Sequence, residues 1–216
     1  MDWTSLAVTG KLALVVTPLL VALALPLAWL LAFTRFPGKP FLEALCNLPL
    51  VLPPTVLGFG LLLAMSPRSS LGQAWKSLFG SNLVFSFSGL VLASMVYSLP
   101  FALQPLRAAF VKLDKSLLES ASVMGLSRLA TFFRVVLPNS LAGLTGAGVL
   151  VFAHTAGEFG VALMVGGSVD GSTKVASIAI FEHVETLRYD AALTMSLVLA
   201  GASYAVLLLM GRINRA

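Results

Sequence analysis

Five long stretches without a charged residue constrain the fold of this chain more than any other feature. No Asp, Glu, Lys or Arg occurs in residues 12–34, 44–67, 77–106, 135–157 or 191–211, and each stretch has at least 21 residues. About 20 residues of helix, rising ~1.5 Å each, cross the ~30 Å hydrocarbon layer of a membrane. The pattern predicts an all-α integral membrane protein with five spans. We expect them at about 11–34, 45–66, 83–106, 137–158 and 191–211.

Composition supports the bilayer as the solvent. The chain has 216 residues, of which 58% are hydrophobic and 11% charged, and its mean hydropathy is +0.95. A soluble domain of this length carries ~25% charged residues. We find neither an internal repeat nor room for a soluble domain, so residues 1–216 are predicted to form a single transmembrane domain. The first apolar stretch is too long for a signal peptide and no cleavage site of small residues follows it, which predicts a retained span.

Residues 158–190 leave the number of spans open. Residues 159–169 are apolar but too few to cross a membrane, and Gly166-Gly167 interrupts them. Residues 174–189 mix charged and apolar side chains. We interpret the region as an external amphipathic helix or a re-entrant piece, with a distorted sixth span as the alternative.

The charges indicate which way the chain lies in the membrane. With five spans, loops 35–43 and 107–134 and the tail 212–216 share one side, which holds nine basic and three acidic residues. The other side holds five basic and six acidic residues. Lys and Arg concentrate in cytoplasmic loops, so the N-terminus is expected outside and the C-terminus in the cytoplasm. The basic pI of 9.7 thus reflects topology, and no nucleic-acid partner is expected.

Catalytic and metal-binding motifs are missing from the sequence. It contains no G-x-S-x-G, no H-E-x-x-H and no acidic pair within a span, so no catalytic residues are predicted. It also lacks the phosphate loop G-x-x-x-x-G-K-[ST], so a partner subunit would have to hydrolyse any ATP. The two histidines have no cysteine near them in sequence, which argues against a metal site. The single cysteine, Cys46, is expected to be a buried apolar side chain.

Proline and small residues divide the spans. Pro53, Pro54 and Thr55 interrupt the second span, and proline removes a backbone donor and bends a helix. This predicts either a kinked helix that lines a pathway or a bent helix that only packs. In the fourth span, small residues recur four apart, at Ala142/Gly146 and Gly143/Ala147. Such faces allow close helix packing, either inside one subunit or across a dimer.

A helix-prone polar insert, residues 112–136, separates the third and fourth spans. Ser116 and Glu119 match a capping box, which would start a helix at about Leu117. Gly125 can close that helix in the left-handed conformation, and Ser127 can cap a second one. Leu137 and Pro138 would then lie in the first turn of the next span. We expect a helical elbow at the membrane surface.

The spacing within this insert resembles a known family. Glu119, Ala121, Gly125, Leu137 and Pro138 form the pattern E-x-A-x₃-G-x₁₁-L-P, which is similar to the EAA loop of binding-protein-dependent ABC importer permeases. Four further stretches look like the molybdate branch of that family. They are FTRFPGK (33–39), LPLVLPPTVLGF (48–59), SLPFALQPLRAAF (98–110) and GEFG (157–160).

The resemblance implies a fold, partners and site residues. The fold would be that of a type I ABC importer permease, working as a homodimer in the inner or plasma membrane of a prokaryote. Its partners would be a cytoplasmic ATPase, which binds ATP and Mg²⁺, and an external solute-binding protein. The EAA residues would couple the chain to the ATPase. Pro53, Pro54, Thr55 and Glu158 are candidates for the translocation path or gate.

Two alternatives to molybdate import stay open from the sequence. The same motifs are compatible with tungstate or sulfate as the oxyanion. His154 and Glu158 are four residues apart and would share one helix face, where a proton-coupled secondary transporter could use them as a relay. Dependence of uptake on ATP, rather than on a proton gradient, would separate the two classes.

Overall fold

The computed structural model describes residues 2–213, and the side chains of residues 2–208. This part of the chain is helical throughout and contains no strand. Residues 214–216, in the tail that we expect in the cytoplasm, lie outside the described residues.

Three helices are long and apolar enough to cross a membrane: α1 (Trp3–Phe33), α5 (Phe87–Val111) and α12 (Tyr189–Ile213). Two further pairs reach that length only when a sharp bend is included. The pair α2 (Lys39–Val51) and α3 (Pro54–Ala64) bends by 115°, and the segment Arg128–Asn139 bends by 75° before α9 (Leu141–Ala156). If each bent pair counts as one span, the described residues hold up to five spans by length and composition.

The bundle is built around α1, α5 and α9, which pack against one another. The buried residues of α1 recur every three or four positions and so form one face of the helix, because an α-helix has 3.6 residues per turn. They are Val8, Leu12, Val16, Leu20, Ala24, Ala28 and Leu31. The opposite face carries exposed leucines, Leu14, Leu19 and Leu23.

The small residues of α9 allow it to approach α5 closely. A Cβ added at Gly143 would lie 2.4 Å from the Cβ of Ala109 and 3.0 Å from the carbonyl oxygen of Pro105, both on α5. Gly143 and Ala147 are buried within this single chain. This row of small residues therefore serves packing inside the subunit, which was one of the two interpretations of the sequence.

The corner between α2 and α3 follows from two adjacent prolines. A residue that precedes proline disfavours the helical conformation. Leu52 precedes Pro53, and Pro53 precedes Pro54; both have extended backbone, with ψ of 136°. Pro54 then starts α3, where its missing N–H leaves no helical hydrogen bond unmade. The expected kink is thus a 115° bend between two separate helices, α2 and α3.

Shorter helices complete the chain. They are α4 (Ser70–Phe79), α6 (Lys115–Val123), α7 (Arg128–Thr131), the π-helical turn η1 (Phe132–Val136), α8 (Leu137–Asn139), α10 (Gly160–Gly166) and α11 (Ala176–Glu185). Region 158–190 contains α10 and α11, neither of which meets the length and hydropathy expected of a span. Among the described residues, this region therefore adds no sixth spanning helix.

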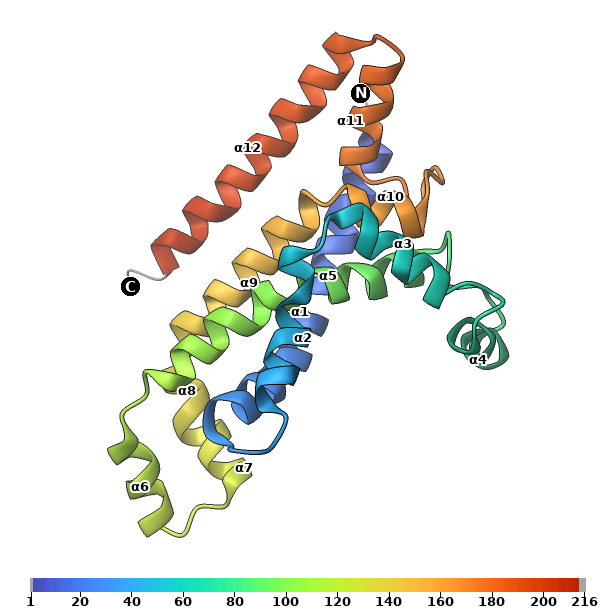
Figure 1. Ribbon diagram of the computed structural model, residues 1–216. Coiled ribbons are helices and arrows are strands. Elements are labelled where there is room, and N and C mark those ends of the chain that lie inside the picture. Colours follow the sequence, from blue (N-terminus) through green and yellow to red (C-terminus); the bar gives the residue numbers. More distant parts are fainter. Residues whose placement is uncertain (1, 214–216) are drawn as a thin grey trace.

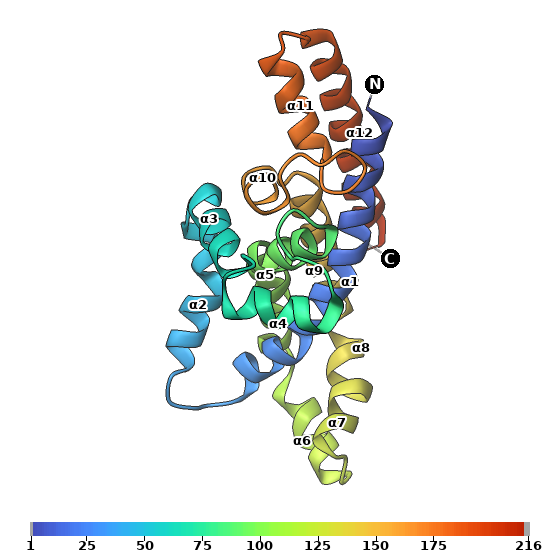
Figure 2. The ribbon, with the colours of Figure 1, turned by 90° about the vertical axis from the view of Figure 1, so that its right-hand side faces the viewer.

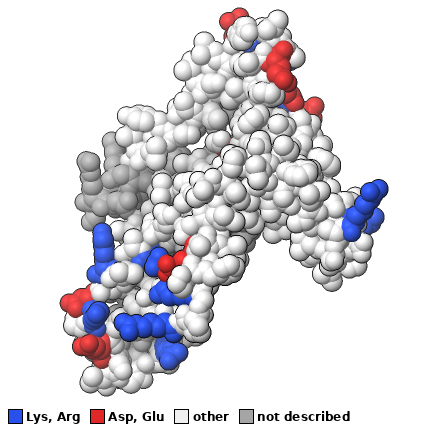
Figure 3. All heavy atoms as spheres, in the orientation of Figure 1, with Lys and Arg blue, Asp and Glu red and all other residues white. Residues whose placement is uncertain are grey.

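The molecule has two distinct ends (Figures 1 and 2). Helices α6 and α7 protrude from the bundle at one end, whereas α11 and the N-terminus lie at the other. Lys and Arg gather toward the α6–α7 end, and acidic side chains mark the tip near α11 (Figure 3). At the α11 end, Lys174 Nζ lies 2.6 Å from Glu182 Oε2 and 3.2 Å from Asp170 Oδ1.

Candidate functional site

The protruding elbow, residues 114–140, begins with an aspartate cap. The backbone N–H of Ser116 donates to Asp114 Oδ1 over 2.9 Å, and α6 starts at Lys115. This hydrogen bond lowers the pKa of Asp114. The predicted capping box of Ser116 and Glu119 is therefore wrong. Asp114 already takes the extended backbone of a cap two residues earlier, which leaves Ser116 inside the helix.

The first helix of the elbow ends as predicted at Gly125. Its φ is +72°, in the left-handed region that glycine adopts without steric cost. Two hydrogen bonds wrap around it: Leu126 N–H donates to the Ala121 carbonyl, and Gly125 N–H to the Ser122 carbonyl, both over 3.0 Å. This pair of bonds is the Schellman motif that closes many helices. The sharp turn sends the chain back toward the bundle.

The second arm of the elbow contains three short helical pieces. Ser127 caps α7 as predicted, because its Oγ accepts a hydrogen bond from the N–H of Ala130. The chain continues through η1 into α8, which holds Leu137 and Pro138, and bends at Ser140 before α9 begins. The expectation that Pro138 lies in the first turn of the span is thus corrected. It lies before the 75° bend, on the elbow side.

The tip of the elbow exposes apolar side chains. Val123 is 89% exposed, Met124 76% and Leu129 70%. Glu119 is also exposed, whereas Ala121 is buried against the rest of the elbow. Exposed apolar residues that cluster on one protrusion are typical of a protein interface.

An aromatic cluster connects the elbow to the bundle. Phe132 of η1 lies edge-to-face against Trp29 of α1, with ring centroids 5.3 Å apart. It also lies edge-on to Phe110 of α5 at 6.3 Å, and Phe110 stacks with Phe33 of α1. Because Phe110 is fully buried, a displacement of the elbow must move α1 and α5 or break this packing.

A second candidate site is a pocket of about 460 Å³ near the α2–α3 corner, which we call the outer pocket. It is lined by Pro54 and Thr55 from α3, Tyr97 from α5, His154 near the end of α9, and Glu158 in the link after α9. His154 is held in place from two sides. Its Nδ1 lies 2.9 Å from Ser98 Oγ, and its ring stacks on Phe101 with centroids 4.1 Å apart.

Glu158 occupies an unusual position in the outer pocket. Its side chain is buried, with 3% exposed, and neither carboxylate oxygen has a hydrogen bond of ordinary geometry, although the Ser94 hydroxyl faces it. α9 ends at Ala156, so Glu158 lies in the link to α10, where the Ser177 hydroxyl donates to its backbone carbonyl over 2.5 Å. The expectation that His154 and Glu158 share one helix face is therefore wrong, although both line the pocket.

The structure places the candidate residues in two groups. Pro54, Thr55 and Glu158 line the outer pocket. Pro53 is not among the residues that line it, but its carbonyl accepts hydrogen bonds from Val56 and Leu57 and so starts α3. The other group, on the elbow, lies at the far end of α5 and comprises Glu119, Ala121, Gly125, Leu137 and Pro138.

The sequence analysis missed two side chains of the outer pocket region. Tyr97 lines the pocket, and Ser98 holds His154 across a gap of 56 residues. Ser98 begins the stretch SLPFALQPLRAAF, but nothing in that stretch indicates its partner. Among the described residues, no group of three or more His, Cys, Asp or Glu side chains could hold a metal. Cys46 is buried, as predicted.

Comparison with solved structures shows the class of fold. A bacterial alginate ABC transporter, crystallised with an alginate pentasaccharide-bound periplasmic protein, contains a chain with a TM-score of 0.77 and 17% identity, covering 98% of this chain and 77% of that one. The MetNI methionine ABC transporter in an inward-facing conformation gives a TM-score of 0.74 and 18% identity, covering 100% and 95%. The chain therefore has the fold of these ABC transporter chains.

Sequence comparison then defines the family. The model of the binding-protein-dependent transport system inner membrane component matches residues 24–216, so the chain belongs to that family. It is 46% identical to the molybdenum transport system permease protein ModB of Azotobacter vinelandii, covering 87% of this chain and 83% of that protein. ModB of Escherichia coli strain K12 is 37% identical, covering 81% and 78%. The sulfate transport system permease protein CysT of the same strain is 32% identical, covering 87% and 66%.

Proposed function

We propose that this chain is the permease subunit of an ATP-driven importer for a tetrahedral oxyanion, molybdate. A binding protein delivers the anion from outside, and a separate ATPase binds the elbow in the cytoplasm. Two copies of the chain form the translocation unit. The chain itself catalyses no reaction and carries no cofactor.

The elbow is the observation that carries this proposal. It protrudes from the end where Lys and Arg gather (Figures 1 and 3) and exposes Val123, Met124 and Leu129 at its tip. An apolar helix tip fits a groove on a soluble partner. Behind it, Phe132 connects the elbow to α1 and α5. A partner that moves the elbow would therefore move α5, which carries Tyr97 of the outer pocket.

The choice of molybdate rests on the relatives. The two ModB proteins have a higher sequence identity to this chain than CysT has. The matched region also covers a larger share of each ModB protein than of CysT. The outer pocket offers an oxyanion the hydroxyls of Thr55 and Tyr97 and the imidazole of His154, and the carboxyl group of Glu158 lines it as well. It contains no Lys or Arg that would hold an anion tightly. A site that only passes an ion onward must bind it weakly.

The direction of the chain rests on charge. The basic end with the elbow is assigned to the cytoplasm, and the acidic α11 end with the N-terminus to the outside. The outer pocket then opens toward the side from which a binding protein delivers its cargo. Pro54, Thr55 and Glu158 would form the gate there, with the Pro53 corner as its hinge.

Uptake into proteoliposomes tests the function. The chain is reconstituted with its ATPase and binding protein, and the entry of radiolabelled molybdate is measured with excess unlabelled molybdate, tungstate or sulfate. We expect uptake that needs ATP, resists a proton uncoupler and is competed by molybdate more than by sulfate. Uptake that persists without ATP and collapses with the uncoupler would instead favour a proton relay through His154 and Glu158.

A further inference from the structure

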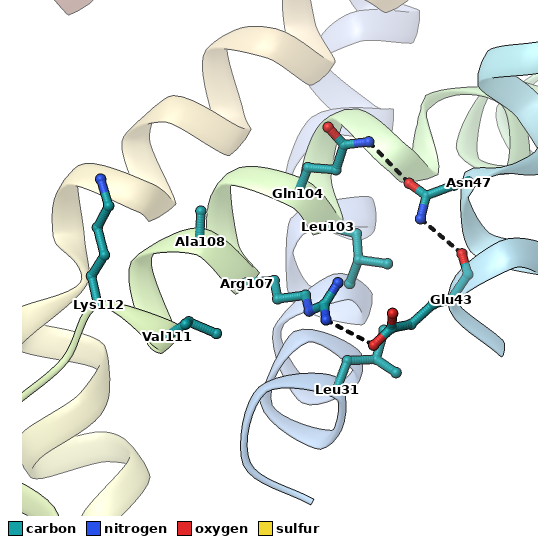
Figure 4. A pocket seen from close by; sticks show the side chains of 9 residues that line it. All are labelled: Leu31, Glu43, Asn47, Leu103, Gln104, Arg107, Ala108, Val111 and Lys112. Carbon is teal, nitrogen blue, oxygen red and sulfur yellow. Dashed lines mark hydrogen bonds and ion pairs between the residues drawn. The ribbon is translucent and has the colours of Figure 1, made fainter. Parts of the chain in front are cut away.

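A second pocket, which we call the inner pocket, lies between α2 and α5 on the elbow side of the α2–α3 corner (Figure 4). Its volume is about 430 Å³. Its polar lining consists of Glu43 and Asn47 on α2, of Gln104 and Arg107 on α5, and of Lys112 directly after α5. A water molecule occupies ~30 Å³ in the liquid, so the pocket has room for an oxyanion together with part of its water.

The polar side chains of the inner pocket are connected to one another (Figure 4). Arg107 Nη2 lies 2.8 Å from Glu43 Oε1. Gln104 Nε2 donates to Asn47 Oδ1 over 3.0 Å, and Asn47 Nδ2 donates to the Glu43 carbonyl over 2.8 Å. Lys112 stands apart, with its ammonium group directed away from the ion pair. Arg107 is therefore the cation at the centre of the pocket.

Glu43 and Arg107 lie at the edges of the loops expected on the cytoplasmic side, whereas Asn47 and Gln104 lie within the expected spans. Gln104 is exposed, and the side chains of Arg107 and Glu43 are 38% and 26% exposed. Polar groups in a membrane domain face water, a cavity or a partner, because the hydrocarbon layer cannot satisfy them. The inner pocket must accordingly be wet or be covered by polar groups of another subunit.

α5 and the bent helix pair α2–α3 contribute residues to both pockets. α5 supplies Tyr97 to the outer pocket and Gln104 to the inner one, and these residues are seven apart, so they share one helix face about 10 Å apart along the axis. The broken partner helix contributes α3 to the outer pocket and α2 to the inner pocket. Gln104 and Arg107 are therefore the polar side chains of the inner pocket that follow Tyr97 along α5 toward the elbow.

We propose that the inner pocket is a transient binding site for the transported tetrahedral oxyanion on the cytoplasmic half of the path. This rests on the proposed function. Arg107 receives the anion, and Glu43 is displaced from the guanidinium and then returns to expel it. The guanidinium of Arg107 can donate two parallel hydrogen bonds to two oxygens of the anion.

The exposure of the ion pair suits such an exchange. Part-exposed ion pairs contribute ~0–1 kcal/mol, because water screens both charges. A divalent anion can therefore displace the Glu43 carboxylate. By competing for Arg107, the same carboxylate keeps the affinity of the site for the anion low. An anion that bound too tightly would not be released onward.

Competition from the cytoplasmic side tests the site. Proteoliposomes holding the complete transporter are loaded with unlabelled molybdate, and the internal concentration that halves the uptake of labelled molybdate is measured. We expect Glu43→Gln to lower that concentration about tenfold, because the competing carboxylate is gone. Arg107→Gln should remove the inhibition, and Arg107→Lys should leave it in part. Lys76→Gln makes the same charge change on α4, which lines neither pocket, and should leave the value within about twofold.

A binding measurement separates this site from the transport function. Radiolabelled molybdate is equilibrated with the purified permease–ATPase complex without binding protein. We expect binding to the Glu43→Gln complex and none to the Glu43→Gln/Arg107→Gln complex. If the wild type imports molybdate but Glu43→Gln neither binds it nor shifts the half-inhibiting concentration, the pair only ties α2 to α5 and the site is overturned. If Glu43→Gln binds molybdate but the wild type imports none, the site stands and the transport function fails.

Discussion

The backbone N–H of Leu126 donates to the carbonyl of Ala121 over 3.0 Å, and Gly125 lies between them at a φ of +72°. A Cβ in the left-handed conformation costs ~1–2 kcal/mol, and more if the residue is β-branched. No atom lies within 4 Å of a Cβ built at Gly125, so the backbone alone demands glycine. We expect Gly125→Val to distort the elbow and abolish uptake while leaving membrane insertion intact.

Asparagine provides the matched control at this position, because it tolerates the left-handed region better than other non-glycine residues. Gly125→Asn should retain most of the uptake and the copurification of the ATPase. If Gly125→Val copurifies with the ATPase and transports normally, the shape of the elbow does not matter for coupling.

A second prediction separates the helix cap from the docking surface. Asp114 caps α6, whereas Glu119 is exposed and makes no contribution to the cap. Asp114→Ala should therefore weaken the first helix of the elbow and reduce ATPase association through loss of structure. Glu119→Lys should reduce association with the helix intact, and Glu119→Gln should reduce it less. Circular dichroism of the purified chain and ATPase copurification measure the two effects.

The pH dependence distinguishes these variants further. The Ser116 N–H bond holds the pKa of Asp114 below its ordinary value of 3.8. The cap is therefore complete above that value and is lost as the pH falls through the lowered pKa. Asp114→Asn should remove this acid-sensitive part of the helix signal. An unchanged acid response in that variant would place its origin elsewhere.

Two glycines of α3 test how closely α3 packs on α10. A Cβ at Gly58 would lie 2.8 Å from the Cβ of Met164, which is too close for any Cβ contact, whereas one at Gly60 meets no atom within 4 Å. Gly58→Ala should cost about 1–3 kcal/mol through overpacking. Gly60→Ala should be neutral or slightly stabilising, because alanine favours the helix. Thermal unfolding in detergent compares them; equal transitions would mean that α10 moves aside freely.

Leu187 offers a stabilising substitution. It has a φ of +58° at the end of α11, and its side chain is 72% exposed. The bonds around it, from Arg188 to His183 and from Leu187 to Val184, are those of a Schellman motif without its usual glycine. Leu187→Gly should therefore raise the free energy of unfolding by about 1 kcal/mol. A lower melting temperature in this variant would show that the Leu187 side chain has a contact outside the monomer.

The ion pair at the α11 end should be sensitive to acid. Hydrogen bonding to Glu182 raises the pKa of Lys174. Burial alone would raise the pKa of Glu182, but hydrogen bonds from Lys174 and Ser168 lower it below 4.5. The pair is therefore complete between these two pKa values and is lost as the pH falls through the lower one. Lys174→Met should cost about 1 kcal/mol at neutral pH, and the difference from wild type should vanish once the Glu182 carboxylate is protonated. A difference that persists after protonation would come from packing.

The sequence predicted the elements of this fold better than their geometry. Uncharged runs predicted the long apolar helices α1, α5 and α12, because the bilayer excludes charge. The kink at Pro53 and Pro54 was expected, but its 115° angle depends on both preceding residues being extended. The cap was assigned to Ser116 because Ser-x-x-Glu is a known pattern, although Asp114 stands two residues before it.

The outer pocket was less predictable than the elbow. Elbow residues lie within one short segment, so their local pattern indicates Gly125 and Ser127 correctly. The contact between Ser98 and His154 depends on how α5 packs against α9, which no local pattern contains. The same holds for the inner pocket, where Glu43 and Arg107 come from different helices.

The 115° bend at Pro53 divides the second span into two separate helices, α2 and α3. A single straight rod would tilt as a whole, so that closing it on one side of the membrane would open it on the other. With a bend near its middle, α2 can change its angle while α3 keeps its packing against α10. In the proposed importer, this independence would allow the path to close on one side of the membrane before it opens on the other.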